Sequence, residues 1–222
     1  MTVTVTLTKQ PELYLEADQI TPDVFAGKTL DEIGAIFISE GKVKYPLSEF
    51  ATIEGAAGET AADTKIVLKG DWTKVKRIGQ QMTAGEIVIE SDADMYIGGW
   101  MKGGKLTVNG NVDSFCGIAM AGGELVVNGN AQNHVGSAYR GDWRGMTGGT
   151  LRVKGNVGND IGTFMRGGTI IVEGDAFIHV LTHGEGGTII VKGNIEGRVG
   201  GQAVKGDVYV NGKIDFMMPG FA

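Results

Sequence analysis

The side chains best suited to chemistry lie in one short stretch, His179-Val-Leu-Thr-His-Gly-Glu185. Two imidazoles and a carboxylate are ligand types that zinc-like sites use. The stretch also departs from the repeat described below, because Leu181 stands where most other copies have a glycine. His179, His183 and Glu185 are therefore the candidate metal ligands, although a surface or interface role for the two histidines is the favoured interpretation. We expect no catalytic and no cofactor-binding residue in the chain.

The remaining reactive groups favour structural roles. A lone cysteine, Cys116, excludes an intrachain disulfide and cannot by itself hold an iron–sulfur cluster or a cysteine-based zinc site. It aligns with aliphatic residues in the other repeats, which predicts a core position. Asp94, Asp113 and Asp215 share one repeat position but belong to different repeats, so they give little support to a polysaccharide-cleaving carboxylate site.

The composition excludes several classes of protein. The chain has 222 residues, 42% of them hydrophobic, and a formal net charge of −6 without any basic block. Binding to a nucleic-acid backbone is therefore not expected. No apolar run approaches the length of a membrane span, and the first residues do not form a signal peptide. We expect a cytoplasmic protein with no membrane span and no nucleic-acid partner.

The 38 glycines reveal a repeat. A Gly-x-aliphatic-x-aliphatic unit begins at Gly85, Gly104, Gly123, Gly149, Gly168, Gly187 and Gly206, with spacings of 19, 19, 26, 19, 19 and 19 residues. The single long spacing is one repeat plus a seven-residue insertion near 138–146. A fixed period of this kind is typical of a solenoid.

Within each repeat, apolar residues alternate as in a strand with one buried face. Because each strand would stack on its own copy in the next repeat, the sequence predicts an all-β, right-handed parallel β-helix of about 19 residues per coil. We assign the single-stranded solenoid to residues 64–222 and a small N-terminal arm and cap to residues 1–63.

Three kinds of repeat position have structural explanations. Glycines at fixed offsets are expected at corners: Gly104, Gly110, Gly117, Gly123, Gly129, Gly136, Gly155, Gly162, Gly193 and Gly200. A row of asparagines predicts a hydrogen-bonded ladder: Asn111, Asn130, Asn156 and Asn194. A row of methionines predicts core filling, with Tyr139 taking the methionine position in the coil that carries the insertion.

The insertion is the best candidate for a partner interface. It concentrates Tyr139, Arg140, Trp143 and Arg144, residue types enriched at interface hot spots. A loop that packs only on itself is the alternative. Trp100 and Phe164 share another repeat position, which forms either an apolar surface stripe or part of the core.

The repeat resembles a known glycine-rich β-helix family. The Gly-x-aliphatic-x-Val-x-Gly-Asn/Asp…Gly-x-x-Met-x-Gly-Gly unit is similar to that of the glutamate synthase C-terminal domain and of the C subunit of formylmethanofuran dehydrogenase. The segments Pro11–Ala17 and Ile20–Ile33 resemble the start of the dehydrogenase protein in particular.

This resemblance implies a role in one-carbon metabolism of methanogenic archaea. The family's enzyme reduces carbon dioxide and attaches the formyl group to methanofuran. The resemblance implies partners that bind a molybdenum or tungsten pterin, iron–sulfur clusters and, in an amidohydrolase-like subunit, a binuclear metal site. The C subunit itself carries none of these cofactors.

Three hypotheses follow. The first is a non-catalytic scaffold subunit of formylmethanofuran dehydrogenase, an oxidoreductase complex. The second is a β-helix module of another assembly, such as a related formyltransferase/hydrolase complex or a glutamate-synthase-like domain. The third is an independent enzyme with its site at His179, His183 and Glu185.

Overall fold

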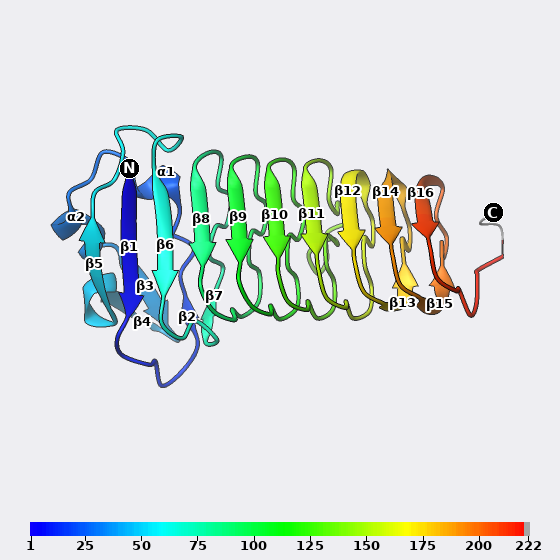
Figure 1. Cartoon of the computed structure of the whole chain (residues 1–222), viewed down its shortest axis with the longest axis horizontal. Helices are drawn as coiled ribbons and strands as arrows, with labels where there is room; N and C mark the ends of the chain where they lie inside the picture. Colours follow the sequence, from blue (N-terminus) through cyan, green and yellow to red (C-terminus); the bar gives the residue numbers. More distant parts are fainter. Residues whose placement is uncertain (220–222) are drawn as a thin grey trace.

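The protein is a rod of stacked coils, seen in a computed structural model that describes residues 1–219 (Figure 1). One strand from each of eight successive coils lies side by side along the rod and pairs in parallel with its neighbours. These strands are β6 (Lys65–Lys69), β8 (Glu86–Ile89), β9 (Lys105–Val108), β10 (Glu124–Val127), β11 (Thr150–Val153), β12 (Arg166–Val172), β14 (Glu185–Val191) and β16 (Lys205–Val210). The parallel β-helix predicted from the repeat is confirmed.

The strands pair in register at the same repeat position. Leu106 of β9 lies opposite Leu125 of β10, which in turn lies opposite Leu151 of β11. All three side chains are fully buried, whereas the charged Lys105 and Glu124 before them face solvent. A side-chain period of two thus places each repeat's aliphatic pair inside the rod, where identical positions stack into a continuous core.

The other side of each coil contains shorter β contacts. Isolated parallel bridges join Val112 to Ala131 and Ala131 to Val157. Two coils extend these bridges into the strands β13 (Ala176–Val180) and β15 (Ile195–Val199). None of the helices in residues 1–219 is long and apolar enough to cross a membrane.

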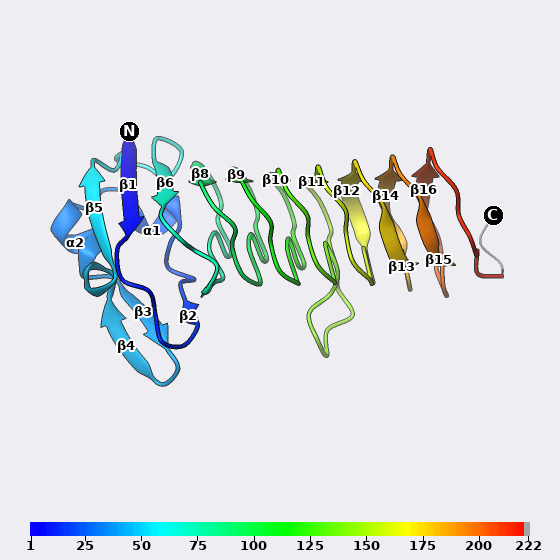
Figure 2. The same ribbon diagram turned by 60° about the horizontal axis from the view of Figure 1, so that its bottom comes forward.

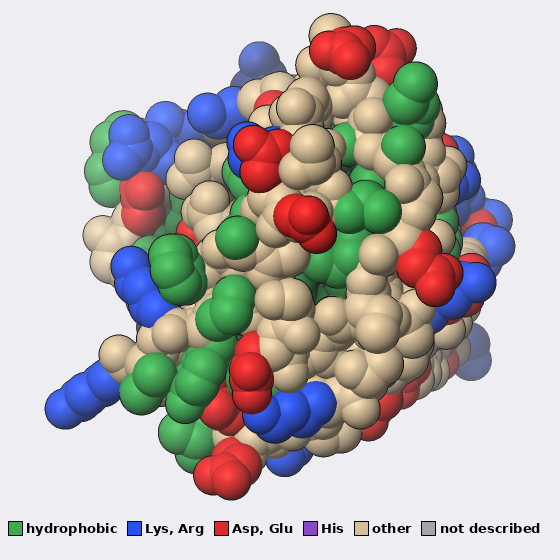
Figure 3. Space-filling model, turned by 90° about the vertical axis from the view of Figure 1, so that its left-hand side faces the viewer, with side chains coloured by type: hydrophobic (Ala, Val, Ile, Leu, Met, Phe, Trp, Pro, Cys, Tyr) green, Lys and Arg blue, Asp and Glu red, His purple; other side chains and the backbone are tan. Residues whose placement is uncertain are grey.

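The N-terminal segment covers one end of the rod and extends its main sheet. The strand β1 (Thr2–Leu7) pairs in parallel with β6, and β5 (Ala51–Gly55) pairs antiparallel with β1. Further elements of this segment pack around them: β2 (Leu15–Glu16), α1 (Pro22–Phe25), α2 (Leu30–Gly34), β3 (Phe37–Glu40), β4 (Val43–Pro46) and a 3₁₀ turn η1 (Leu47–Glu49). The strand β2 pairs in parallel with β7 (Val75–Lys76) of the first coil. Figure 3 shows that this end presents side chains of both charges around a hydrophobic patch.

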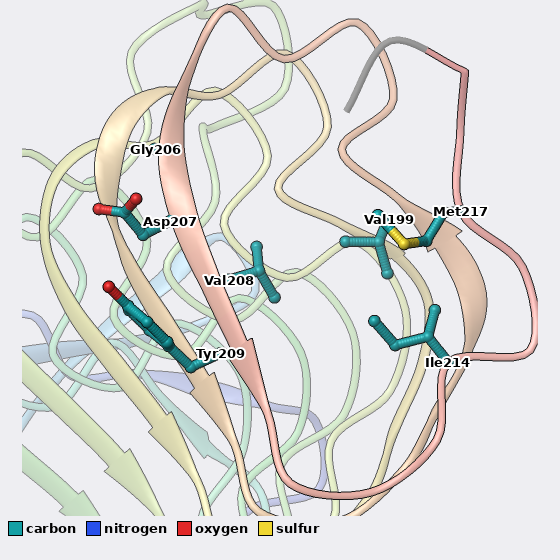
Figure 4. Close-up of a pocket in the computed structure, with 7 residues that line it drawn as sticks. All are labelled: Val199, Gly206, Asp207, Val208, Tyr209, Ile214 and Met217. Atoms are coloured by element: carbon teal, nitrogen blue, oxygen red, sulfur yellow. The ribbon is translucent and has the colours of Figure 1, made fainter. Parts of the chain in front are cut away.

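At the opposite end the core is partly open. A hollow of about 180 Å³ is lined by residues of β15, β16 and the chain that follows. Val199, Val208 and Ile214 face one another across it, while Asp207 and Tyr209 lie on the outer side of β16 (Figure 4). Val208 and Ile214 are half-buried, in contrast to the fully buried residues at the same repeat positions in earlier coils.

Glycines at the same repeat position lie above one another in successive coils and form columns along the rod. These columns have two different backbone geometries. Gly117 has φ +61°, a left-handed backbone, and a β-carbon there would lie 2.3 Å from the Leu151 Cδ1 atom. Gly129 does not have positive φ, but a β-carbon there would lie 2.6 Å from the Asn111 Oδ1 atom and 2.7 Å from the Gly110 carbonyl oxygen. Both columns therefore exclude a side chain, the first by conformation and crowding and the second by close approach of the neighbouring coil.

We predict that Gly117→Ala destabilises the protein more than Gly141→Ala does. Both sites have positive φ, so each alanine costs roughly 1–2 kcal/mol in backbone strain. At Gly141 nothing lies within 4 Å of an added β-carbon. At Gly117 the clash with buried Leu151 adds roughly 1–3 kcal/mol. Urea denaturation of the two variants measures the difference, and equal midpoints would contradict this account.

The asparagine row forms a ladder to the backbone of the next coil. The Asn111 Oδ1 atom accepts the backbone N–H of Asn130 at 2.8 Å, and the Asn130 Oδ1 atom accepts that of Asn156 at 2.8 Å. Asp175 performs the same function for Asn194 at 2.7 Å. The common requirement is therefore a side-chain oxygen acceptor, because it satisfies a corner N–H that lies outside the strand pairing.

We predict that Asn130→Ala destabilises the protein by about 1 kcal/mol and that Asn130→Asp costs less. Alanine leaves the Asn156 N–H without its acceptor, whereas aspartate retains the oxygen, as Asp175 does naturally. Asn128→Ala is the control, because Asn128 is exposed and its side chain donates to Asn109 rather than accepting a corner N–H. Thermal melting measures all three, and an Asn130→Ala effect no larger than the control's would refute the acceptor role.

Candidate interaction surface

One side of the rod is built from residues with an unusual backbone conformation. Fourteen residues other than glycine have positive φ in the described chain, and thirteen of them form two columns along the coils. The first column consists of Arg77, Tyr96, Phe115, His134, Asp160, His179 and Arg198. The second consists of Gln81, Trp100, Ala119, Phe164, His183 and Gln202.

The coil-to-coil hydrogen bonds stabilise this left-handed backbone. The N–H groups of Phe115 and His134 each donate at 2.8 Å to a carbonyl one coil further on, and the Trp100 N–H does so at 2.7 Å. A left-handed conformation costs roughly 1–2 kcal/mol per residue, and it persists where the surrounding structure fixes it. The result is two rows of side chains fixed at the spacing of the coils.

In the first column the side chains stack on one another. The rings of Tyr96 and Phe115 lie 4.9 Å apart with an interplanar angle of 6°, and those of Phe115 and His134 lie 4.7 Å apart at 7°. The Arg77 guanidinium lies 4.9 Å from the centre of the Tyr96 ring. We call Arg77, Tyr96, Phe115 and His134 the aromatic stack. Their regular spacing of 19 residues is visible in the sequence, and the sequence-based predictions above missed it.

The insertion projects from the rod just before β11 (Figure 2), and its first residues contact the rings of the two columns. The Tyr139 ring lies 5.4 Å from that of Trp100 and 6.1 Å from that of Tyr96. The Arg140 guanidinium lies over Phe115 at 5.6 Å. The first half of the insertion is therefore packed against the rod, which gives the loop a defined position.

The second half of the insertion carries an exposed tryptophan between two arginines. Trp143 is 55% exposed, with the Arg166 guanidinium 4.1 Å and the Arg144 guanidinium 5.5 Å from its ring centre. Asp142 accepts hydrogen bonds from the backbone N–H groups of Trp143 and Arg144 and pairs with the Arg144 side chain. These bonds, with the Arg144 side chain foremost, hold the pKa of Asp142 below its usual value.

The structure corrects one assignment in this loop. Tyr139 does not take the methionine position; Met146 does, fully buried and donating its N–H to the Gly136 carbonyl at 3.1 Å. The inserted residues thus precede the methionine, whose flexible apolar side chain fills the core where the chain rejoins the coil. Tyr139 is 37% exposed and begins the loop instead.

The column of Trp100 and Phe164 lies at the surface, with both side chains partly exposed. The Phe164 ring stacks on that of His183 at 4.7 Å and 5°. This column therefore forms a second surface row beside the first and is not part of the core, which resolves the alternative left open by the sequence.

The candidate metal ligands have separate partners. His183 stacks on Phe164, and the Glu185 carboxylate pairs with Arg166 at 2.9 Å. His179 lies between Asp160 and Arg198, with its Nδ1 atom 3.4 Å from an Asp160 oxygen. Within residues 1–219 no three His, Cys, Asp or Glu side chains form a group that could hold a metal ion.

Cys116 is fully buried in the core, where burial raises the pKa of its thiol to about 12. The thiol is therefore protonated at neutral pH and unsuited to nucleophilic chemistry.

The three aspartates of one repeat position have different surroundings. Asp94 is only 6% exposed, Asp113 is half-buried and bonds to Ser114, and Asp215 is exposed near the opposite end. Burial raises the pKa of Asp94, opposed in part by the Met95 N–H, which donates to its Oδ1 atom at 2.7 Å.

We predict that Asp94→Asn stabilises the protein at neutral pH. Because the folded-state pKa of Asp94 lies above its unfolded value, the wild-type stability falls as the pH rises through that range. Asparagine retains the acceptor for Met95 and cannot ionise. The variant's urea midpoint should exceed that of the wild type at neutral pH, and the difference should shrink near about pH 4. A variant that is less stable at neutral pH would contradict the burial effect.

No protein-family model matches the chain, but individual relatives do. The C subunit of the tungsten-containing formylmethanofuran dehydrogenase 2 of Methanothermobacter thermautotrophicus is 49% identical over 96 residues, which is 43% of this chain and 36% of the relative. The C subunit of the molybdenum-containing formylmethanofuran dehydrogenase 1 of Methanosarcina barkeri is 49% identical over 89 residues, 40% of this chain and 30% of the relative. The corresponding protein of the tungsten-containing enzyme of Methanococcus maripaludis is 57% identical over 132 residues, 60% of this chain and 47% of the relative.

The matched part of the chain thus spans less than half the length of these relatives. A solved structure is similar over nearly the whole chain. A chain of the formyltransferase/hydrolase complex from Methylorubrum extorquens, determined with methylofuran, superposes with a TM-score of 0.89. The superposition covers 99% of this chain and 80% of that chain at 26% identity. The resemblance found in the sequence is thereby confirmed, and the chain is similar to the C subunit of formylmethanofuran dehydrogenase from methanogenic archaea.

Proposed function

We propose that the chain is a non-catalytic scaffold subunit of a formylmethanofuran dehydrogenase complex. The observation that carries this proposal is the 49–57% identity to the C subunits of that oxidoreductase. Such a complex would reduce carbon dioxide and attach the formyl group to methanofuran. In this proposal the molybdenum or tungsten pterin, the iron–sulfur clusters and the binuclear metal site lie in the other subunits.

The construction of the rod supports a scaffold role. Stacked coils present the same repeat positions at regular intervals along one direction, so residues far apart in the sequence have fixed separations. The side chains of the candidate metal site pair with neighbours of the same rod. Those pairings favour structural and surface roles over an independent enzyme.

Membership of a formyltransferase/hydrolase complex is the second candidate. The superposition on 99% of this chain favours it, since the fold match extends beyond the segments matched to the dehydrogenase subunits. The two candidates differ in their partners, because only the dehydrogenase would bring pterin and iron–sulfur subunits.

We propose further that Tyr139, Arg140, Trp143 and Arg144 bind a partner protein of the complex. Trp143 combines high exposure with a position fixed by two arginines, and residues of these types contribute most binding energy at interfaces. The loop also extends beyond the surface of the coils, where a partner can surround it (Figure 2).

We predict that the tagged full-length chain co-purifies from its native cells with pterin and iron–sulfur subunits, identified by mass spectrometry. The variant with Trp143→Ala and Arg144→Ala should bind them at least about 30-fold more weakly, which corresponds to a loss of about 2 kcal/mol. Its melting temperature should stay close to that of the wild type, because both side chains lie outside the core.

Phe177→Ala is the matched control, since Phe177 is also 55% exposed but lies outside the insertion. Recovery of the wild-type chain without those subunits would argue against the dehydrogenase assignment. A normal yield of complex with the double variant would remove the loop from the interface while leaving the assignment intact.

A further inference from the structure

The strand β16 forms an open edge of the main sheet at one end of the rod. It is the outermost strand of the ten-stranded sheet, and among the described elements it pairs only with β14. The hollow of about 180 Å³ lies beside it, with Val199, Val208 and Ile214 facing one another across the space (Figure 4). Unpaired backbone and incompletely covered core therefore meet at the same place.

The backbone groups at this edge are those that earlier coils use to hold the next coil. The Val191 carbonyl, for example, accepts the N–H of Asn211 at 3.0 Å. Val210 occupies the same repeat position one coil further on, and within residues 1–219 its carbonyl accepts no hydrogen bond. Because alternate residues of a parallel strand bond to opposite neighbours, Val208 presents its N–H and carbonyl on the same open side as Val210.

The edge lacks the features that normally prevent strand addition. From Asp207 to Val210 the pairing with β14 is continuous and contains neither a bulge nor a proline. The inward-facing residues are valines and not charged residues. Natural proteins usually protect a free edge with one of these features, and an unprotected edge is the surface to which an extended peptide adds as a strand.

The asparagine ladder ends in the same coil. The Asn194 Oδ1 atom accepts the backbone N–H of Lys213 at 3.0 Å, but Lys213 has no side-chain oxygen to offer a following coil. Every earlier coil from Asp92 onward has asparagine or aspartate at this position. A further coil of the repeat would leave its corner N–H without an acceptor, whereas a single added strand has no such corner.

The charges of the outer face indicate what the added strand carries. On this face Lys65 of β6 pairs with Glu86 of β8 at 3.0 Å, and Lys105 of β9 pairs with Glu124 of β10 at 3.8 Å. Asp207 of β16 lies on the same face, is exposed, and forms no ion pair among the described residues (Figure 4). A basic side chain on a neighbouring strand would complete this pairing.

We propose that β16 binds an extended segment of a partner protein as an additional strand. The segment has aliphatic side chains opposite Val208 and Val210, which enter the hollow and extend the core. It has a basic side chain opposite Asp207 on the outer face. A second copy of the chain fits less well, because antiparallel pairing with Val208 opposite Val208 places Tyr209, and no basic residue, opposite Asp207. This inference goes beyond the proposed function and does not depend on it.

The probe for this edge is the peptide acetyl-Gly-Lys-Leu-Thr-Val-Asn-Gly-amide, which has the sequence of residues 104–110. Its lysine, leucine and valine have the required spacing, since β9 uses them in the same way inside the rod. Titration into the ¹⁵N-labelled full-length chain should shift the backbone amide signals of Val208 and Val210 until they saturate. The same peptide N-methylated at threonine and valine keeps every side chain but has both hydrogen-bonding edges blocked, and it should not bind.

A charge exchange tests the predicted basic residue. Asp207→Lys should weaken binding of the peptide by about two- to fivefold, the range of one exposed ion pair. The peptide with glutamate in place of its lysine should show the opposite preference and bind Asp207→Lys better than the wild type. Glu59→Lys is the matched control, because it makes the same change at an exposed residue of the N-terminal segment and should leave both affinities unaltered.

Four outcomes would overturn the proposal. One is the absence of saturable shifts at Val208 and Val210. Equal binding of the N-methylated peptide would show hydrophobic contact without strand pairing. Equal effects of Asp207→Lys and Glu59→Lys would remove the basic residue from the description of the partner. Shifts of the same two signals with protein concentration alone, accompanied by dimers in sedimentation experiments, would identify a second copy as the occupant.

Discussion

In-register stacking of identical backbone positions is the constraint on which the structure depends. Within a coil of about 19 residues the backbone makes only short turn bonds, such as that from the Met101 N–H to the Gly98 carbonyl, and most other backbone groups bond to the coils before and after. The Gly129 N–H, for example, donates to the Gly110 carbonyl at 2.9 Å. Each coil must therefore follow the path of its neighbours, and any residue whose side chain obstructs that path is excluded.

The same constraint explains the surface. In the first column every coil from Arg77 to Arg198 bends through a left-handed residue at the same position, whatever its side chain. Tyr96, Phe115 and His134 accept this conformation and their rings stack at 4.7–4.9 Å, which is the spacing between paired strands. A left-handed backbone would be unfavourable in a single turn, but here the contacts between stacked coils hold it in place. The result is a rigid row of aromatic and charged side chains.

The insertion and a hollow of about 260 Å³ beside Arg198 and Gly201, near the C-terminal end of the described chain, are places where this regularity is modified without being lost. The insertion leaves after Ala138 and returns at Met146, so the coil closes in register and the added residues lie entirely outside. In the hollow, the column continues with Arg198 in place of an aromatic ring, and the space beside Gly201 is left unfilled. Both features add specific groups to a surface that is otherwise fixed by the repeat.

Glycine spacing and aliphatic alternation were enough to predict the β-helix, because they report directly on which positions stack. The sequence also indicated the burial of Cys116, which follows from alignment between coils. The position of Met146, the direction of the Trp100 column and the partners of His179 became known only from the folded structure. These depend on where a loop rejoins the stack and on which side of a left-handed residue its side chain emerges. Periodicity cannot report either, because it records how often a position recurs and not the direction in which it points.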